Sequence, residues 1–181
     1  MAAALPTWAD WRYGHRGTPM IRPVAAGEAE ALRELRLRAL VDSPEAFVSD
    51  VESESAHEPA HWEQLTAGGD ERIVLVAQDE GGRLAGMVGG GWFDRERGIA
   101  HLWGLWVEPA IRGSGVGAAL VRGILEWAVG AGAGSVRLGV IDPGGDGTTA
   151  FYRRLGFVAL DEPVPLRADP SRSVTYMIRS V

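Results

Sequence analysis

The residues with the clearest chemical signature form a glycine-rich segment in the second half of the chain. Glycine stands at positions 113, 115 and 117, and Arg112 comes directly before them. Glycine lets the backbone approach a ligand closely, and the first amide groups of a helix have no partner within that helix. Such helix N-termini bind anions, and an arginine can donate two parallel hydrogen bonds to a phosphate. The segment therefore predicts a pyrophosphate-binding site.

The same glycines allow a second interpretation. Residues 113–118 match the dinucleotide-binding pattern G-x-G-x-x-G/A, and Asp142 lies where its acidic partner would fall. A dinucleotide-binding fold places its glycines almost directly after a strand, among repeated strand–helix units. Here residues 108–111 separate the predicted strand from the glycines, and hairpins precede them. A dinucleotide site is therefore the weaker alternative, beside a glycine-rich helix start that binds no ligand.

Two histidines spell a motif known from zinc proteases. His57, Glu58 and His61 match H-E-x-x-H, which binds zinc only when both histidines share one face of a continuous helix. Pro59 interrupts the motif, because proline removes a helical hydrogen bond and disfavours helical geometry at the preceding residue. We therefore expect a loop followed by a helix start, and no metal site.

His101 is the histidine best placed for acid–base chemistry. It opens a strand predicted over residues 99–107, and two-residue alternation puts it on one face with Trp103, Leu105 and Val107. An imidazole with a pKa of about 6.5 suits proton transfer at neutral pH. A strand histidine that bonds to a backbone carbonyl or faces solvent explains the position equally well.

Hydrophobic periodicity predicts the elements that position these residues. Helices are predicted over residues 28–41, 59–67, 115–129 and 148–155, and strands over residues 20–25, 72–77, 84–93, 99–107, 135–141, 157–160 and 173–178. The connections at residues 79–82 and 94–98 are short, polar and contain glycine, which is typical of antiparallel hairpins. The pattern predicts one α+β or mixed α/β domain built on a largely antiparallel sheet.

Composition excludes several classes of protein. The 181 residues suffice for one core, so we expect an extension over residues 1–17 and a single domain over residues 18–181. A net charge of −6 argues against a nucleic-acid partner, and the absence of cysteine excludes disulfides, thiolate metal sites and a cysteine nucleophile. No segment has the apolar length of a membrane span or the pattern of a secretion signal. We therefore expect no membrane partner and a cytoplasmic protein.

Two motifs in the correct order resemble the GNAT acetyltransferase superfamily. Arg112-x-x-Gly115-x-Gly117 is similar to the family's R/Q-x-x-G-x-G/A motif, and residues 151–157, Phe-Tyr-Arg-Arg-Leu-Gly-Phe, resemble its F/L-Y-x-x-x-G-F motif. The resemblance runs from about residue 21 to the C-terminus. Gly145 stands where the family often has asparagine. The resemblance implies that a contact to the cofactor or a structural cap is missing there.

By this resemblance the fold would be a mixed, mostly antiparallel sheet of about six to seven strands, flanked by about four helices and splayed between its fourth and fifth strands. Acetyl-CoA would be the co-substrate, with its pantetheine arm paired to the backbone of Leu105, Trp106 and Val107. Tyr152 would contact the cofactor and protonate the departing thiolate, unless it only packs in the core. The remaining contacts would come from Arg112, Gly113, Ser114, Gly115, Val116, Gly117 and Ala118.

The resemblance also implies the reaction. His101 stands where some histone-acetylating members carry a glutamate base, and without cysteine the simplest reaction is direct acetyl transfer to a primary amine of a small molecule or peptide. Trp92 and Trp103 could line an acceptor cleft, with nearby carboxylates suited to an amine cation: Glu52, Glu54 and Asp94. A non-catalytic acyl-CoA-binding sensor and a dinucleotide-dependent oxidoreductase are the alternatives. The identity of the acceptor and a homodimeric state stay open.

Overall fold

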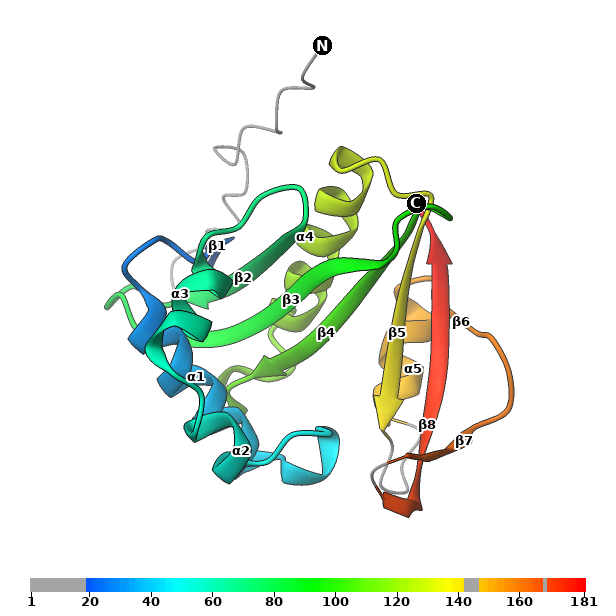
Figure 1. Ribbon diagram of the computed structural model, residues 1–181, viewed down its shortest axis with the longest axis horizontal. Coiled ribbons are helices and arrows are strands. Elements are labelled where there is room, and N and C mark those ends of the chain that lie inside the picture. The colour runs from blue at the N-terminus through cyan, green and yellow to red at the C-terminus, as the bar shows by residue number, and fades with distance from the viewer. Residues whose placement is uncertain (1–18, 142–146, 168) are drawn as a thin grey trace.

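An eight-stranded sheet organises the described part of the chain, in the strand order β1-β2-β3-β4-β5-β8-β6 with β7 beside β8 (Figure 1). The computed structural model describes residues 19–141, 147–167 and 169–181. The predicted extension over residues 1–17, together with Asp142 and Gly145, lies outside these residues. The strands are β1 (Met20–Pro23), β2 (Arg72–Gln78), β3 (Leu84–Asp94), β4 (Ile99–Val107), β5 (Ser135–Ile141), β6 (Val158–Ala159), β7 (Val164–Leu166) and β8 (Asp169–Ser180).

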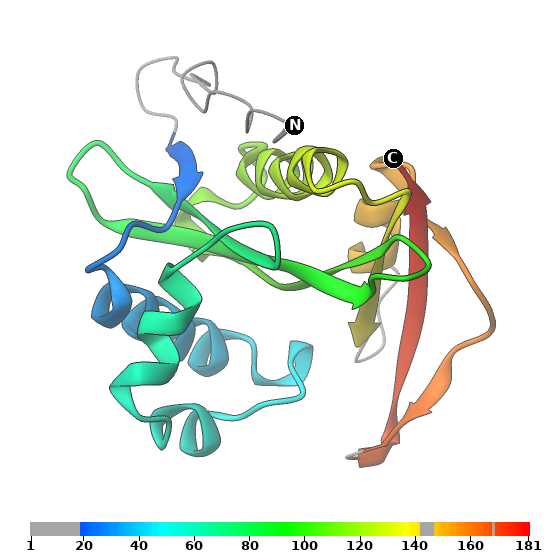
Figure 2. The ribbon, with the colours of Figure 1, turned by 45° about the horizontal axis from the view of Figure 1, so that its top comes forward.

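Helices cover both faces of this sheet. They are α1 (Ala29–Asp42), α2 (Val51–Ser55), α3 (Pro59–Thr66), α4 (Val116–Gly130) and α5 (Gly147–Arg154), with short 3₁₀ turns at Pro44–Ala46 and Pro109–Ile111. Figure 2 shows α4 on one side of the sheet and α1 to α3 on the other. Strand β2 is buried on both faces: Ile73 and Leu75 pack under α4, whereas Val74 and Val76 pack against α1. The core therefore has two layers, one on each side of the sheet.

The sheet is antiparallel except where β4 meets β5. These two strands are parallel and pair at only three positions, from Ile99 with Ser135 to His101 with Arg137. Beyond these pairs the strands diverge (Figure 1). The predicted separation between the fourth and fifth strands is confirmed, and it opens the sheet toward the ends of both strands.

A β-bulge at Gly104 corrects the predicted facing of β4. Met87 pairs with Trp106 and Gly89 pairs with Trp103, so two residues of β4 stand opposite one residue of β3. Gly104 takes a φ of +66°, which glycine adopts without strain. The extra residue reverses the alternation of side chains. Trp103 consequently packs on the α1 side, whereas Leu105 packs on the α4 side.

Val107 also packs on the α4 side, so the single face predicted for His101, Trp103, Leu105 and Val107 is wrong. Other departures from the predicted elements are small. Helix α2 was not predicted, because its residues are polar; a reciprocal pair of hydrogen bonds between Asp50 and Ser53 caps it instead. Strand β7 contains a proline and is only three residues long. In the described residues, no helix is long and apolar enough to cross a membrane.

Candidate active site

The diverging halves of β4 and β5 enclose a cleft of about 710 Å³. One wall is β4 from Leu102 to Val107, and the other is β5 from Leu138 to Ile141. The rest of the lining comes from the segment after α1, the glycine loop, α4 and α5. Because β4 pairs with β5 only as far as His101, the rest of this edge has no partner among the described strands. A free strand edge can bind an extended ligand through backbone hydrogen bonds.

The glycine loop lies along the same cleft and begins α4. Gly113 and Gly115 have φ values of +79° and +91°, and an added Cβ would meet no atom within 4 Å at either position. Backbone conformation, not space, therefore demands glycine there. Within the described residues, the amides of Val116, Gly117 and Ala118 donate to no backbone carbonyl, and no side chain caps the helix. Free amides of this kind are what an anion site requires, and anion binding by this loop stays a prediction.

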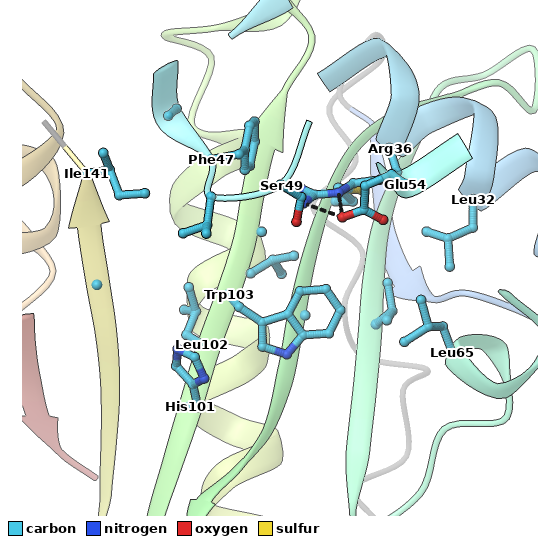
Figure 3. A pocket seen from close by; sticks show the side chains of 18 of the residues that line it. Leu32, Arg36, Phe47, Ser49, Glu54, Leu65, His101, Leu102, Trp103 and Ile141 are labelled. Atoms are coloured by element: carbon cyan, nitrogen blue, oxygen red, sulfur yellow. Dashed lines mark hydrogen bonds and ion pairs between the residues drawn. The ribbon is translucent and has the colours of Figure 1, made fainter. Parts of the chain in front are cut away.

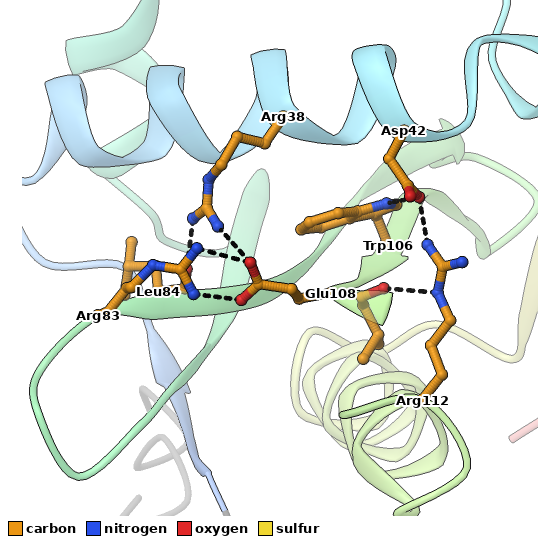
Figure 4. A network of polar contacts seen from close by, with 8 residues as sticks. Arg38, Asp42, Arg83, Leu84, Trp106, Glu108 and Arg112 are labelled. Atoms are coloured by element: carbon orange, nitrogen blue, oxygen red, sulfur yellow. Dashed lines mark hydrogen bonds and ion pairs between the residues drawn. The ribbon is translucent and has the colours of Figure 1, made fainter. Parts of the chain in front are cut away.

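Arg112 does not extend freely from the loop. Its Nε donates to the carbonyl of Val107 at 2.9 Å, and its Nη2 donates to Asp42 (Figure 4). The hydroxyl of Ser43 and Nε1 of Trp106 donate to the same carboxylate at 2.6 and 2.9 Å. These donors, the Ser43 hydroxyl foremost, lower the pKa of Asp42 to about 2. Among the described residues, only Nη1 of Arg112 has no partner, so the paired phosphate contact expected of Arg112 stays a prediction.

A second ion-pair network fixes the end of β4. Glu108 accepts hydrogen bonds from Arg83 and from Arg38, whose Nη2 also donates to the carbonyl of Leu84 at 2.6 Å (Figure 4). The bonds from Arg83 are the largest cause of a lowered pKa at Glu108. A carboxylate engaged in this way braces the turn before the loop and is not placed to act as a base.

Tyr152 reaches the cleft from α5. Its side chain is buried and packs edge to face against Phe151 and Phe157. Burial raises the pKa of the hydroxyl well above its ordinary value, so Tyr152 is protonated throughout the physiological range. The position combines both roles weighed from the sequence: the ring packs in the core, and the residue lines the cleft where a proton donor was expected.

A second cavity of about 570 Å³ lies on the α1 side of the sheet and shares residues 102–104 with the cleft (Figure 3). His101 lines this cavity and stands edge to face with Phe93, with ring centroids 6.3 Å apart. Burial, and secondarily the charge of Arg137, lower the pKa of His101 below 6.5. The imidazole is therefore neutral at pH 7, the form that accepts a proton.

Comparison with known proteins decides the family. Residues 30–157, more than half of the chain, match the model of the Acetyltransferase (GNAT) family. The chain belongs to this family. A relative in Oryza sativa subsp. japonica, glucosamine 6-phosphate N-acetyltransferase 1, is 32% identical over 146 residues, which span 74% of this chain and 86% of that protein.

Solved structures agree with the GNAT fold. An acetyltransferase of the GNAT family from Streptococcus pneumoniae has a TM-score of 0.75 and 20% identity, and the match covers 90% of this chain and 99% of that one. A phosphinothricin acetyltransferase from Sinorhizobium meliloti, solved in complex with acetyl-CoA, has a TM-score of 0.72 and 18% identity, covering 91% and 89%. The predicted mixed α/β GNAT fold is confirmed.

The zinc-protease motif of this GNAT chain does not form a helical site. Helix α3 begins at Pro59, so His57 lies before it. The structure nevertheless stacks His57 on His61, with ring centroids 4.0 Å apart, and brings one ligand atom of Glu54 within 4.8 Å of both. These three side chains could hold a cation. It would have to compete with Arg36, which donates twice to Oε1 of Glu54.

Only some of the residues that the sequence suggested for an acceptor cleft line the second cavity. Trp103 and Glu54 line the second cavity, but Trp92, Asp94 and Glu52 do not. Trp92 packs under α4, on the opposite side of the sheet. Of the three carboxylates considered from the sequence, only Glu54 therefore lines this cavity, and binding of an amine there stays a prediction.

Sequence reasoning missed Arg36, which lines the second cavity from α1. Its signal was available: Arg36 lies four residues after the buried Leu32, and residues at that spacing share one face of a helix. A charged residue on the buried face of an amphipathic helix indicates a polar partner or a ligand. From the sequence alone, however, Arg36 cannot be distinguished from Arg33 and Arg38, the other two arginines of the helix.

Proposed function

We propose that this protein transfers the acetyl group of acetyl-CoA directly to a primary amine of a small molecule or peptide. The observation that carries the proposal is the junction of the two cavities at residues 102–104. Two substrates that meet at a shared opening can react in a ternary complex, without an acetylated side chain. The chain has no cysteine to carry an acetyl group in the alternative, two-step reaction.

The chemistry of the cleft fits coenzyme A. Leu105, Trp106 and Val107 lie on the free edge of β4, which suits the amide-rich pantetheine arm. Acetyl-CoA supplies the acetyl group as an activated thioester. Arg112 contributes through Nη1, since its other nitrogens hold Val107 and Asp42. The loop that would hold the pyrophosphate comprises Gly113, Ser114, Gly115, Val116, Gly117 and Ala118.

Tyr152 is the general acid in this proposal. A bond forms between the amine nitrogen and the acetyl carbon while the carbon–sulfur bond breaks, so the amine loses a proton and the sulfur gains one. Tyr152 is protonated and lines the cleft, so it can donate to the sulfur. Because burial raises the pKa of the phenol, the hydroxyl keeps its proton until the departing thiolate takes it.

His101 is the general base. An alkyl amine with a pKa of about 10.4 is almost entirely protonated at pH 7, and only the neutral form attacks. His101 lines the acceptor side of the junction and is neutral at pH 7, so it can take the proton that the amine gives up. The acid and the base therefore serve different substrates from different cavities.

A small amine suits the second cavity best. Its volume of about 570 Å³ is in the range of small-molecule sites. The relative from Oryza sativa acts, by its name, on glucosamine 6-phosphate, a primary amine on a single sugar. These two observations favour a small-molecule acceptor over the end of a peptide.

Release of coenzyme A thiol from acetyl-CoA, measured across a panel of small amines and peptides, tests the proposal. The expected result is saturable, protein-dependent release with at least one primary amine, and an N-acetylated product by mass spectrometry. Binding of acetyl-CoA without release of thiol for any acceptor would indicate a non-catalytic acyl-CoA-binding sensor. Binding of NAD(P) in place of acetyl-CoA would indicate a dinucleotide-dependent oxidoreductase.

A further inference from the structure

The second cavity contains a buried guanidinium, and one of its nitrogens has no hydrogen-bond partner among the described residues. Arg36 enters the cavity from α1, and its side chain is 11% exposed (Figure 3). Its Nε and Nη2 donate to Oε1 of Glu54 at 3.2 and 2.9 Å, and its guanidinium lies over the ring of Phe47 at 4.5 Å. Nη1 is buried and has no hydrogen-bond partner among the described residues. The guanidinium is thus held in place, with one buried nitrogen unpaired.

This free nitrogen lies near the junction of the two cavities. A Cβ added at Gly104 would be 3.9 Å from Nη1, and Gly104 lines both the cleft and the second cavity. A buried charged donor without a partner is costly and therefore uncommon in folded proteins. A ligand oxygen at the junction would remove that cost.

Among the described residues, the lining of the second cavity contains no unpaired carboxylate, in a chain whose net charge is −6. Four residues that carry or can gain positive charge line it: Arg36, His57, His61 and His101. Glu54 is the one carboxylate in its lining, and it is already paired with Arg36. An anionic group would therefore meet hydrogen-bond donors in this cavity and no unpaired negative charge.

We propose that the acceptor is an amine that also carries an acidic oxygen group, a carboxylate or a phosphate, and that Nη1 of Arg36 donates a hydrogen bond to that group. The inference rests on the proposed function and specifies its substrate class. Glu54 orients the guanidinium for this contact. Arg36 is then a specificity-determining residue, distinct from the groups that move protons.

Matched pairs of amines test this substrate class. Glucosamine 6-phosphate is compared with glucosamine, and phenylalanine with phenylalaninamide, each for kcat/KM in acetyl-CoA-dependent thiol release. The diamine cadaverine serves as a purely cationic acceptor. We expect the acidic member of at least one pair to be preferred by about tenfold or more, the scale of one charge-assisted hydrogen bond. The pair that responds distinguishes phosphate from carboxylate recognition.

Variants then assign the preference to Arg36. Replacing Arg36 alone would leave Glu54 buried and unpaired, so the test uses the double variant Arg36→Met with Glu54→Gln, which removes both charges. The preference for the acidic member should fall about tenfold. Arg33→Met with Glu30→Gln is the matched control, because it also removes one ion pair that involves α1, and neither residue lines the cavity. It should keep the preference.

Each outcome is decisive. A preference for cadaverine, or for the member of both pairs that lacks the acidic group, overturns the inference. The proposed function still stands in that case, because these amines are acetylated. An equal loss for both members of a pair in the double variant also overturns it, since Arg36 would then act on the shared chemistry of transfer. If no acceptor at all releases thiol, the proposed function has failed, and the inference with it.

Discussion

At the scale of single residues, the two groups proposed to move protons line different cavities. Tyr152 lines the cleft between β4 and β5, whereas His101 lines the second cavity, and residues 102–104 border both. Burial acts on both, but with different consequences. It raises the pKa of the phenol, which keeps a proton available, and lowers the pKa of the imidazole, which keeps an acceptor available. These directions suit an acid on the sulfur side and a base on the amine side.

Tyr152→Phe should lower kcat about a hundredfold and leave the affinity for acetyl-CoA within a factor of about three. The ring and its packing against Phe151 and Phe157 remain, and only the hydroxyl is lost. Steady-state kinetics with a binding titration by calorimetry measure both effects. An unchanged kcat would show that the hydroxyl plays no part in proton transfer.

The pH profile of kcat/KM should report His101. Because the pKa of His101 is lowered, the acidic limb of this profile should lie below pH 6.5. On that limb, the slope of log kcat/KM against pH should be one unit steeper than it is at higher pH. Arg137→Met removes a nearby positive charge that disfavours the imidazolium, so the limb should move to higher pH. His101→Ala should abolish the change of slope. A profile that is the same in all three proteins contradicts the assignment.

At the scale of elements, the C-terminal end of α1 is tied to the end of β4 and to the glycine loop. Asp42 is the last residue of α1, where a negative charge is unfavourable to the helix dipole. Three donors around it, from Ser43, Trp106 and Arg112, offset that cost. The helix that contributes Arg36 to the second cavity therefore also holds Arg112 beside the cleft.

Asp42→Asn should raise the KM for acetyl-CoA about threefold to tenfold, because Arg112 loses its ionic anchor. The folded carboxyl has a pKa of about 2 against an ordinary 3.8, so its contribution to stability is present above pH 4 and is lost as pH falls toward 2. Denaturant unfolding should show the variant less stable by up to about 1 kcal/mol at pH 7, allowing for solvent screening. The difference in the free energy of unfolding between the two proteins should be smaller at pH 3. A difference that does not change with pH would show that ionisation of Asp42 does not cause it.

Gly115→Ala should weaken acetyl-CoA binding at least about tenfold. The φ of +91° at this position costs any L side chain about 1 kcal/mol or more, so the loop would shift its amides to relieve the strain. Gly134→Ala is the control: its φ is not positive, and an added Cβ there also meets no atom within 4 Å. Equal affinities in the two variants would indicate that loop conformation does not govern binding.

At the scale of the whole molecule, the sheet has two halves joined by very little backbone pairing. Strands β1 to β4 form one antiparallel half, β5 to β8 form the other, and three parallel pairs connect them. Helix α4 packs against β2, β3 and β4 and also contacts β5, which helps to hold the halves together. The opening that results runs from the glycine loop to the junction with the second cavity.

Acetyl-CoA should protect this opening and stabilise the fold. Amides along residues 102–107 and 138–141 line the cleft, so those that pair with the cofactor should exchange hydrogen more slowly when it is bound. Ligand at about 100 times its Kd adds roughly 2.7 kcal/mol, a rise in Tm of about 5–10 °C for a chain of this size. Hydrogen exchange with mass spectrometry, and thermal unfolding, test this. Protection confined to β1 and β2 would place the ligand elsewhere.

Short segments of the sequence were enough to predict much of the fold and part of the candidate site. The glycine loop, the hairpins and the amphipathic helices follow from backbone conformation and from apolar periods of two or 3.6 residues, which are properties of short segments. Gly113 and Gly115 have the positive φ values that a tight anion-binding turn demands. For the same reason the family could be inferred from two short motifs, before any contact was known.

Contacts between distant segments decided the rest. One bulge at Gly104 sends Leu105 away from the face of His101, and a strand's periodicity carries no sign of such an insertion. Asp42 and Arg112, 70 residues apart, meet only because α1 crosses the end of β4. The second cavity is lined by residues of three helices, α1 to α3, and of six strands, β2 to β5, β7 and β8. Packing and charge pairing are properties of the folded whole, so no local pattern encodes them.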